Sequence, residues 1–298
     1  MKRPDQDFWN VAVDCTLRLM PFIVALGCSR SEQSEKQSAQ QPPKPSAESP
    51  MQSPTPPEAI AARERGKACL KAGDPAKALT AFDEAIRLDQ NYADAYCQRG
   101  NAHFDLAQFD KAIADFKTAV RLDPKLFEAY CNRGLTYSEK GQFEEAIADY
   151  TKAAEVKPSE ADVAYRGRAN VHIAMHQLDK AIADFDKAIQ AKETCGAAYG
   201  GRGKAYFDKG NLSKAMDDCT RAIELDPKNA LWFMQRAGIY SQSNDPKHAV
   251  ADFSEAIRLD PENSALYQLR GQTYRALGEK VQAEADLAKA KQLQDGTK

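Results

Sequence analysis

The sequence predicts an all-α fold made of repeated pairs of short helices, and two observations support this prediction. Residues 127–160 read as two amphipathic helices whose small and aromatic residues lie three and four positions apart, on one face of each helix. The same pattern returns after 34 residues, and a proline closes four of the copies. Because a helix pair of this length cannot bury its apolar stripes alone, we expect the pairs to stack against one another.

Seven copies of the pattern are present, and the same packing positions justify each of them. The predicted repeats span residues 59–92, 93–126, 127–160, 162–195, 196–229, 230–263 and 264–297. The eighth position is small in every copy, as Gly66, Gly100, Gly134, Ala169, Gly203, Ala237 and Gly271. A mostly bulky residue stands between two alanines of the second helix, as Phe82, Phe116, Tyr150, Phe185, Cys219, Phe253 and Leu287. A small residue opposite a large one lets two helices approach closely.

Two local features depart from the pattern. His176 and Asn244 stand where a turn glycine is more common, so the pattern does not fix the helix ends at these two turns. Gly200 and Gly201 are adjacent inside a predicted helix, and we expect them to loosen it locally.

The recurring pattern resembles the tetratricopeptide repeat (TPR) family from Ala59 to the C-terminus. The resemblance implies a right-handed superhelical α-solenoid of seven helix-turn-helix repeats. It also implies that the first helices line a concave groove which holds a protein or peptide partner. The function that follows from the resemblance is that of a non-catalytic protein–protein interaction scaffold or adaptor.

Opposite charges recur in register along the repeats. An arginine precedes the small residue of every first helix, and an aspartate precedes the bulky position of the second helix in copies two to seven. Such regular charges predict structural ion pairs between packed helices, which fix their register. The first copy has Ala81 where the others have aspartate.

The first 28 residues differ in kind from the repeats. Leu19–Cys28 is an uncharged apolar run that follows Arg18, and it is too short to span a bilayer as a helix. It suits the apolar core of a signal peptide. Gly27, Cys28 and Ser29 resemble a bacterial lipoprotein cleavage site, which implies that Cys28 is lipidated. The alternative is a frayed or membrane-surface N-terminal helix.

Residues 29–57 form a linker that is rich in Ser, Gln and Pro and has no glycine. This composition cannot bury a core, so we expect disorder. A lipid-anchored cysteine, a disordered linker and a repeat domain together predict a tether at a bacterial cell envelope, facing the periplasm or the exterior. TPR lipoproteins of this layout assist pilus assembly, envelope-enzyme recruitment or outer-membrane assembly. The alternatives are a cytoplasmic, co-chaperone-like adaptor, or the substrate-recognition subunit of a separately encoded enzyme.

The candidate partner-binding residues lie on the first helices of repeats two to four, beside the packing stripe. They are Cys97, Gln98, Asn101, Phe104, Asn132, Arg166 and Asn170. Side-chain amides donate to and accept from a peptide backbone, so Asn101, Asn132 and Asn170 are the leading candidates. The alternative is that these residues are solvated and hold no ligand.

Two sets of positions bear on the binding of a charged partner. In the chaperone-binding TPR subclass a basic and amide set grips a C-terminal carboxylate, but Cys97, Val163 and Gly167 occupy its three basic positions here, so that activity is not expected. Arg63, Lys67 and Lys71 form one basic stripe on a helix face, which suits an acidic partner, the anionic membrane surface near the tether, or simply a solvated surface.

The composition offers little to support an enzyme. The net charge is −2, which gives no basis for binding nucleic acid. His172 and His176 are four residues apart, but no further ligand stands at a supporting spacing for a metal. His103 and His172 occupy a position where other copies carry tyrosine, so we expect them to pack. No glycine-rich phosphate loop or Ser/His/Asp set is evident, and we expect no cofactor, no metal and no small-molecule substrate.

Overall fold

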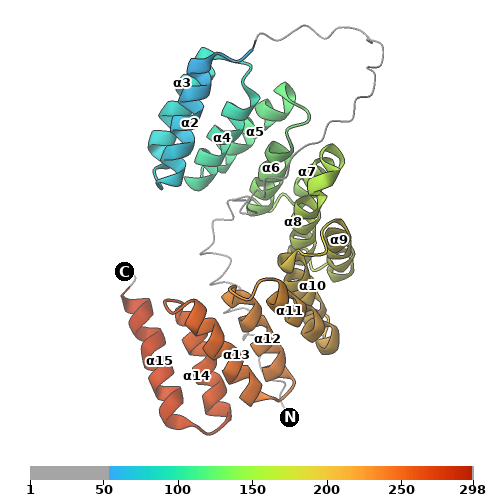
Figure 1. Ribbon diagram of the computed structural model, residues 1–298, viewed down its shortest axis with the longest axis vertical. Helices are drawn as coiled ribbons and strands as arrows, with labels where there is room; N and C mark the ends of the chain where they lie inside the picture. The colour runs from blue at the N-terminus through green and yellow to red at the C-terminus, as the bar shows by residue number, and fades with distance from the viewer. Residues whose placement is uncertain (1–53, 297–298) are drawn as a thin grey trace, which may run out of the picture. The chain divides into compact units, whose positions relative to one another are not determined.

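The computed structural model describes residues 54–296, and this part of the chain is helical (Figure 1). Its α-helices follow one another with no strand between residues 54 and 296. The predicted all-α fold is therefore confirmed. The predicted leader 1–28, the linker as far as residue 53 and the lipidation site Cys28 lie outside the described residues. Within that same described part, every helix is too short or too polar to cross a membrane.

The helices alternate between the first and the second member of each pair. The first helices are α2 (Pro57–Lys71), α4 (Ala93–Asp105), α6 (Phe127–Glu139), α8 (Ala161–Ala174), α10 (Gly196–Asp208), α12 (Ala230–Gln242) and α14 (Ser264–Ala276). The second helices are α3 (Pro75–Leu88), α5 (Phe109–Leu122), α7 (Phe143–Val156), α9 (Leu178–Ala191), α11 (Leu212–Leu225), α13 (Pro246–Leu259) and α15 (Lys280–Asp295). A 3₁₀ turn, η1 (Pro158–Glu160), precedes α8, whose first residue, Ala161, is the one residue between the third and fourth predicted repeats.

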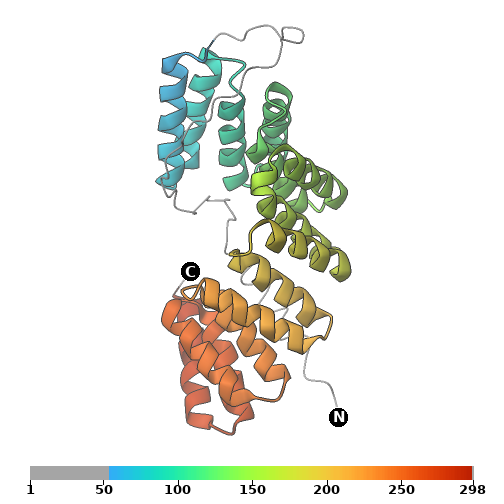
Figure 2. The same ribbon diagram turned by 45° about the vertical axis from the view of Figure 1, so that its right-hand side comes forward.

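These helices belong to two compact units, an N-terminal unit of α2–α5 and a C-terminal unit of α6–α15. Within each unit the two helices of a pair pack along one another, and each second helix also packs against the first helix of the following pair. The views in Figures 1 and 2 show this succession of hairpins through α12–α15. Repetition of one local contact thus builds each unit.

Small residues allow this close packing, as the sequence pattern predicts. In the N-terminal unit, a Cβ atom on Gly66 would lie only 2.4 Å from Cε1 of Phe82. On Gly100 it would lie 2.7 Å from Cε1 of Phe116. Both phenylalanines are fully buried. Each glycine therefore provides the space that a ring of the partner helix occupies.

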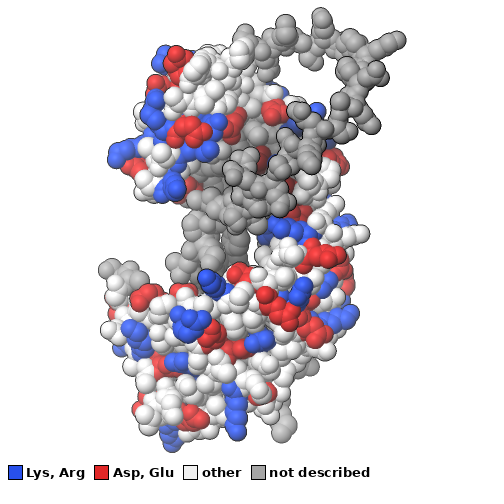
Figure 3. All heavy atoms as spheres, viewed as in Figure 1, with Lys and Arg blue, Asp and Glu red and all other residues white. Residues whose placement is uncertain are grey.

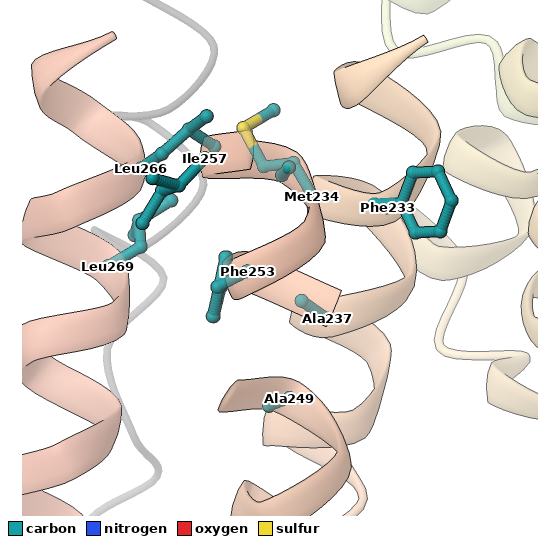
Figure 4. Packing of buried hydrophobic residues seen from close by; sticks show 9 residues of the cluster. Phe233, Met234, Ala237, Ala249, Phe253, Ile257, Leu266 and Leu269 are labelled. Atoms are coloured by element: carbon teal, nitrogen blue, oxygen red, sulfur yellow. The ribbon is translucent and has the colours of Figure 1, made fainter. Parts of the chain in front are cut away.

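The core of the C-terminal unit shows the same principle with larger side chains (Figure 4). Phe253 of α13 is fully buried beside Ala237 and Ala249, and Leu266 and Leu269 of α14 cover the other side of α13. Aliphatic and aromatic side chains from three successive helices thus form one cluster. Its stability depends on the neighbouring pair, which is why a single pair is insufficient.

The predicted ion pairs between packed helices are confirmed. In six repeats the arginine guanidinium donates from Nε and Nη2 to both carboxylate oxygens of the aspartate sixteen residues later. These pairs are Arg99–Asp115, Arg133–Asp149, Arg168–Asp184, Arg202–Asp218, Arg236–Asp252 and Arg270–Asp286. All six aspartates are buried. In the first repeat, Arg65 instead donates from Nη2 to Glu84 Oε2 at 2.6 Å, and both side chains are exposed.

The turn between the helices of a pair has one conformation in all seven repeats. Its central residue has a positive φ, whether it is glycine or not. The seven residues are Gly73, Ala107, Gly141, His176, Gly210, Asn244 and Gly278. The turns at His176 and Asn244 therefore match the glycine turns in backbone conformation. The packing of the two helices imposes this conformation even on Ala107, at φ 55°.

Two expectations about local structure are wrong. Gly200 and Gly201 do not loosen their helix, because α10 runs without interruption from Gly196 to Asp208. A Cβ atom on Gly200 would lie 2.3 Å from the Trp232 ring, and one on Gly201 would lie 2.4 Å from the Phe185 ring. The two glycines therefore make room for neighbouring aromatic rings. The predicted linker also extends one residue too far, since Pro57 is the first residue of α2. Proline is tolerated there because the N–H of the first helical residue has no partner within the helix.

Candidate functional site

The candidate binding residues all lie on first helices, but they are divided between the two units. Cys97, Gln98, Asn101 and Phe104 belong to α4 of the N-terminal unit. Asn132 of α6, and Arg166 and Asn170 of α8, belong to the C-terminal unit. The structure thus presents two surfaces to consider, one in each unit.

A connected polar network covers the first-helix surface of the N-terminal unit. Along α4, Gln98 Nε2 donates to Asp94 Oδ1 at 3.2 Å, and Asn101 Nδ2 donates to Gln98 Oε1 at 3.3 Å. From α2, the Arg63 Nε atom lies 3.2 Å from Asp94 Oδ2 and donates to the Tyr92 hydroxyl at 2.9 Å. We call these five residues the α2–α4 network. It fixes the Gln98 and Asn101 amides relative to one another.

The network changes the interpretation of the basic stripe. Arg63 is only 18% exposed at its side chain and is held by Asp94, Tyr92 and Glu64. Lys67 Nζ lies 3.7 Å from Glu64 Oε2. The stripe is therefore largely neutralised by its own unit, and it does not present three available cations.

Phe104 and Cys97 differ in their accessibility. Phe104 is half-buried, with its ring centroid 5.5 Å from that of Phe109 and the two rings tilted by 54°. It leaves part of an apolar ring exposed on α4, the helix that carries Gln98 and Asn101. Cys97 is fully buried, so its thiol packs in the interior and is not part of the binding surface.

The C-terminal unit presents a second set on α6 and α8. Asn132 is half-buried, and its backbone carbonyl accepts from Thr136 Oγ1 at 2.7 Å. The Arg166 Nη2 atom lies 3.9 Å from Asp162 Oδ2, while its Nε is buried with no hydrogen-bond partner among the described residues. Asn170 is exposed. Of the seven candidates, Asn170 is thus the most accessible amide.

Neither surface has the features of a nucleophilic or metal site. Burial raises the pKa of the Cys131 thiol far above its ordinary value, and burial raises the pKa of Cys219 to about 12, so neither forms a thiolate at neutral pH. His172 lies against Gln177 and Asp184, whereas His176 forms the turn. Between residues 54 and 296 no group of three or more His, Cys, Asp or Glu side chains could hold a metal ion. On the face drawn in Figure 3, basic and acidic side chains are intermixed.

Sequence reasoning missed the residues that hold the network together. Tyr92 is the last residue of the first predicted repeat, and Arg63 was predicted only as part of the basic stripe. Asp94 was not among the candidates, although it stands four residues before Gln98. That spacing places the two side chains on one face of a helix, and it is the signal that could have identified them. The contact from Arg63 joins two repeats, and only the packed structure shows it.

Comparison with protein families gives matches through most of the repeat region. A family model described as "TPR repeat" matches residues 66–107 and 100–141. Models described as "Tetratricopeptide repeat" match residues 127–160, 196–229 and 233–263. Together the matches cover more than half of the chain. No curated protein matches it.

Solved structures share the same fold at low sequence identity. A tetratricopeptide repeat protein from Parabacteroides merdae is 22% identical with a TM-score of 0.62, covering 79% of this chain and 93% of that chain. PilW, described as a widely conserved type IV pilus biogenesis factor, is 16% identical with a TM-score of 0.63, covering 70% of this chain and 96% of its own. PilF of Pseudomonas aeruginosa is 16% identical with a TM-score of 0.61, covering 74% and 97% respectively. These similarities concern the fold.

Proposed function

Because this chain belongs to the tetratricopeptide repeat family, we propose that it is a non-catalytic scaffold which holds an extended segment of a partner protein against its first helices. The family fold suggests protein–protein interaction in general. The residues that carry it out in this chain, and its place in the cell, are our proposal.

The observation that carries the proposal is the α2–α4 network. Ordering a polar side chain on binding costs conformational entropy, and a network that already holds Gln98 and Asn101 reduces this cost. Each amide can still exchange hydrogen bonds with a peptide backbone, since an amide has two donors and an acceptor with two lone pairs. Phe104 adds a half-buried apolar surface on the same helix. An extended segment of mixed composition suits this combination.

The C-terminal unit supplies the same chemistry on α8. Asn170 is exposed, and Arg166 carries a buried Nε atom that has no partner in the described part of the chain. A buried donor without a partner is costly, so a bound carbonyl oxygen that reached it would be stabilised. Asn132, on α6, completes the set of amides.

We further propose that the scaffold is tethered to a bacterial cell envelope through lipidated Cys28 and the linker that follows it. The support is the order of parts in the sequence, an apolar run, a cysteine, a Ser/Gln/Pro-rich segment and the repeats. A 29-residue linker would reach about 30 Å as a flexible coil, enough to hold the repeats away from a membrane surface.

Affinity capture tests the binding surface. The full chain and the variant Asn101→Ala/Asn132→Ala/Asn170→Ala are each used to capture partners from an envelope extract. The matched control is Gln190→Ala/Gln282→Ala/Gln292→Ala, which removes three exposed amides from second helices. We expect the first variant to lose the partners that the wild type and the control both retain. Retention of every partner by the first variant would remove these amides from the account.

The tether has a separate test. Palmitate labelling and detergent partitioning are compared between the wild type and Cys28→Ala. We expect label and membrane association in the wild type only. Equal behaviour of the two chains would favour the cytoplasmic adaptor.

A further inference from the structure

A pocket outside the proposed binding surface lies in the C-terminal unit, where α7, α8 and α9 meet. It has a volume of about 360 Å³. Ile147 of α7 forms one wall, and Arg168 and His172 of α8 form another. Lys180, Ala183, Asp184 and Lys187 of α9 complete the lining. Both second helices contribute, so the pocket is distinct from the first-helix surfaces described above.

The charged side chains that line this pocket differ in how far they are paired with one another. Arg168 donates to both oxygens of Asp184 at 2.7 Å and to Thr151 Oγ1 at 2.7 Å, so its guanidinium is already engaged. Lys187 Nζ lies 3.6 Å from Asp184 Oδ1 and 5.6 Å from the centroid of the Tyr165 ring, and its side chain remains half exposed. Lys180 forms no ion pair with any residue between 54 and 296. The lining thus holds three cations, Arg168, Lys180 and Lys187, against the single carboxylate of Asp184, and its net charge is positive.

The neighbouring repeats show that this arrangement is particular to the fourth one. The positions of Lys180, Ala183 and Lys187 are occupied by Lys214, Asp217 and Arg221 in the next repeat, where an acidic side chain stands between the two cations. In the preceding repeat they are Glu145, Ala148 and Lys152. Among repeats three, four and five, only the fourth combines two cations with a small residue between them.

We propose that this pocket binds neighbouring carboxylates of an acidic segment in a partner protein. Lys180 and Lys187 are seven residues apart on α9, which separates their Cα atoms by about 10 Å along the helix axis. That spacing suits two carboxylates, one at each ammonium group, with the small Ala183 leaving room between them. Phosphate recognition favours an arginine that can donate two parallel hydrogen bonds to the phosphate. Arg168 already donates such a pair, from Nε and Nη2, to the Asp184 carboxylate. The proposal goes beyond the first-helix surface, and its test is independent of the amides on α4, α6 and α8.

Fluorescence anisotropy with a labelled octaglutamate peptide tests the proposal on the full chain. The test variants are Lys180→Gln/Lys187→Gln, which removes the two charges, and Ala183→Asp, which copies the next repeat. The matched control, Lys214→Gln/Arg221→Gln, removes the same charge from the corresponding positions one repeat later. Circular dichroism melting of each variant establishes that it is folded. A second peptide, with one phosphoserine among neutral residues, tests the phosphate alternative.

We expect the wild type and the control to bind octaglutamate equally, and Lys180→Gln/Lys187→Gln to bind about tenfold more weakly. Ala183→Asp should also weaken binding, because it places a carboxylate between the two ammonium groups. Equal losses in the test and control double variants, or no binding by the wild type, would overturn the proposal. Tighter binding of the phosphoserine peptide would replace the carboxylate assignment with a phosphate one.

Discussion

Arg133 donates two hydrogen bonds to Asp149, from Nε to Oδ2 at 2.7 Å and from Nη2 to Oδ1 at 2.6 Å. The guanidinium carbon also lies 5.6 Å from the centroid of the Tyr130 ring. The Arg133 guanidinium thus joins α6 to α7 through its two N–H donors, while its planar face packs against an aromatic ring of its own helix. The same relationship recurs in five other repeats, so it belongs to the repeat itself.

Replacing Arg133 by alanine should lower the melting temperature and destabilise the fold by about 2–3 kcal/mol, because it removes the two charge-assisted hydrogen bonds to the buried Asp149 carboxylate. Urea unfolding followed by circular dichroism measures the change. The control is Arg65→Ala at the same position of the first repeat, where the side chains of Arg65 and Glu84 are 55% and 44% exposed. That change should cost less than about 1 kcal/mol. An unchanged unfolding curve for Arg133→Ala would contradict the pairing.

Ala107→Gly should stabilise the protein by about 0.5–1 kcal/mol. Ala107 has φ 55°, a conformation that costs an L-residue about 1–2 kcal/mol and glycine nothing, and the greater freedom of glycine in the unfolded chain offsets part of the gain. Gly141→Ala makes the reverse change at the same turn of the next repeat, where no atom lies within 4 Å to obstruct the new Cβ. Chemical unfolding of both variants should give shifts of opposite sign. Shifts of the same sign would show that φ is not the cause.

These turns mark the limit of what the sequence could predict. The helices follow from the periodic placement of small and apolar residues, and the ion pairs follow from the register of Arg and Asp, so both were predictable. The positive φ of Ala107 was not predictable, because alanine has no preference for it and only the docking of α4 against α5 requires it. Gly200 and Gly201 were misread for the same reason, since the rings that fill their space belong to other helices.

Gly200→Ala should destabilise the protein by about 1–3 kcal/mol, although alanine is the better helix former, because the new Cβ would lie 2.3 Å from the Trp232 ring. The test compares the change in unfolding free energy that Gly200→Ala causes in the wild type with the change that it causes in the Trp232→Ala background. Alanine stands at the Trp232 position in the preceding repeats, as Ala198 and Ala164. In that background the cost should disappear. If the cost persisted there, close contact with the indole would not explain it.

Stability should fall on acidification in a way that depends on His172. Burial lowers the pKa of His172 below its ordinary value of 6.5, against the opposing effects of Asp184 and Gln177. The unfolded chain therefore binds more protons than the folded chain between the two pKa values. Unfolding free energy should accordingly decrease as the pH falls from above 6.5 toward the lower, folded-state pKa.

Unfolding free energies of the wild type and His172→Tyr, measured from pH 8 to pH 5, isolate this effect. Tyrosine is the residue found at the same position in other repeats, as Tyr137 and Tyr206, and it does not titrate in this range. The variant should lose part of the dependence that the wild type shows below pH 6.5. Identical slopes would exclude His172 as its source.

The candidate site could be predicted only in part from the sequence. The choice of Gln98 and Asn101 relied on their spacing along one helix, and the structure shows them joined by a hydrogen bond. Arg63 and Tyr92 enter the same network from outside that helix, and no pattern within a single repeat could place them there. Cys97 shares the helix but is fully buried, which the spacing alone could not distinguish from an exposed position.

Photo-crosslinking tests the central claim most directly, namely that the first helices hold the partner. A benzophenone side chain is introduced in place of Asn170, exposed on α8, and separately in place of Gln292, exposed on α15. After irradiation in the presence of the captured partner, we expect a covalent adduct from position 170 and none from position 292. Adducts from position 292 alone would contradict the account.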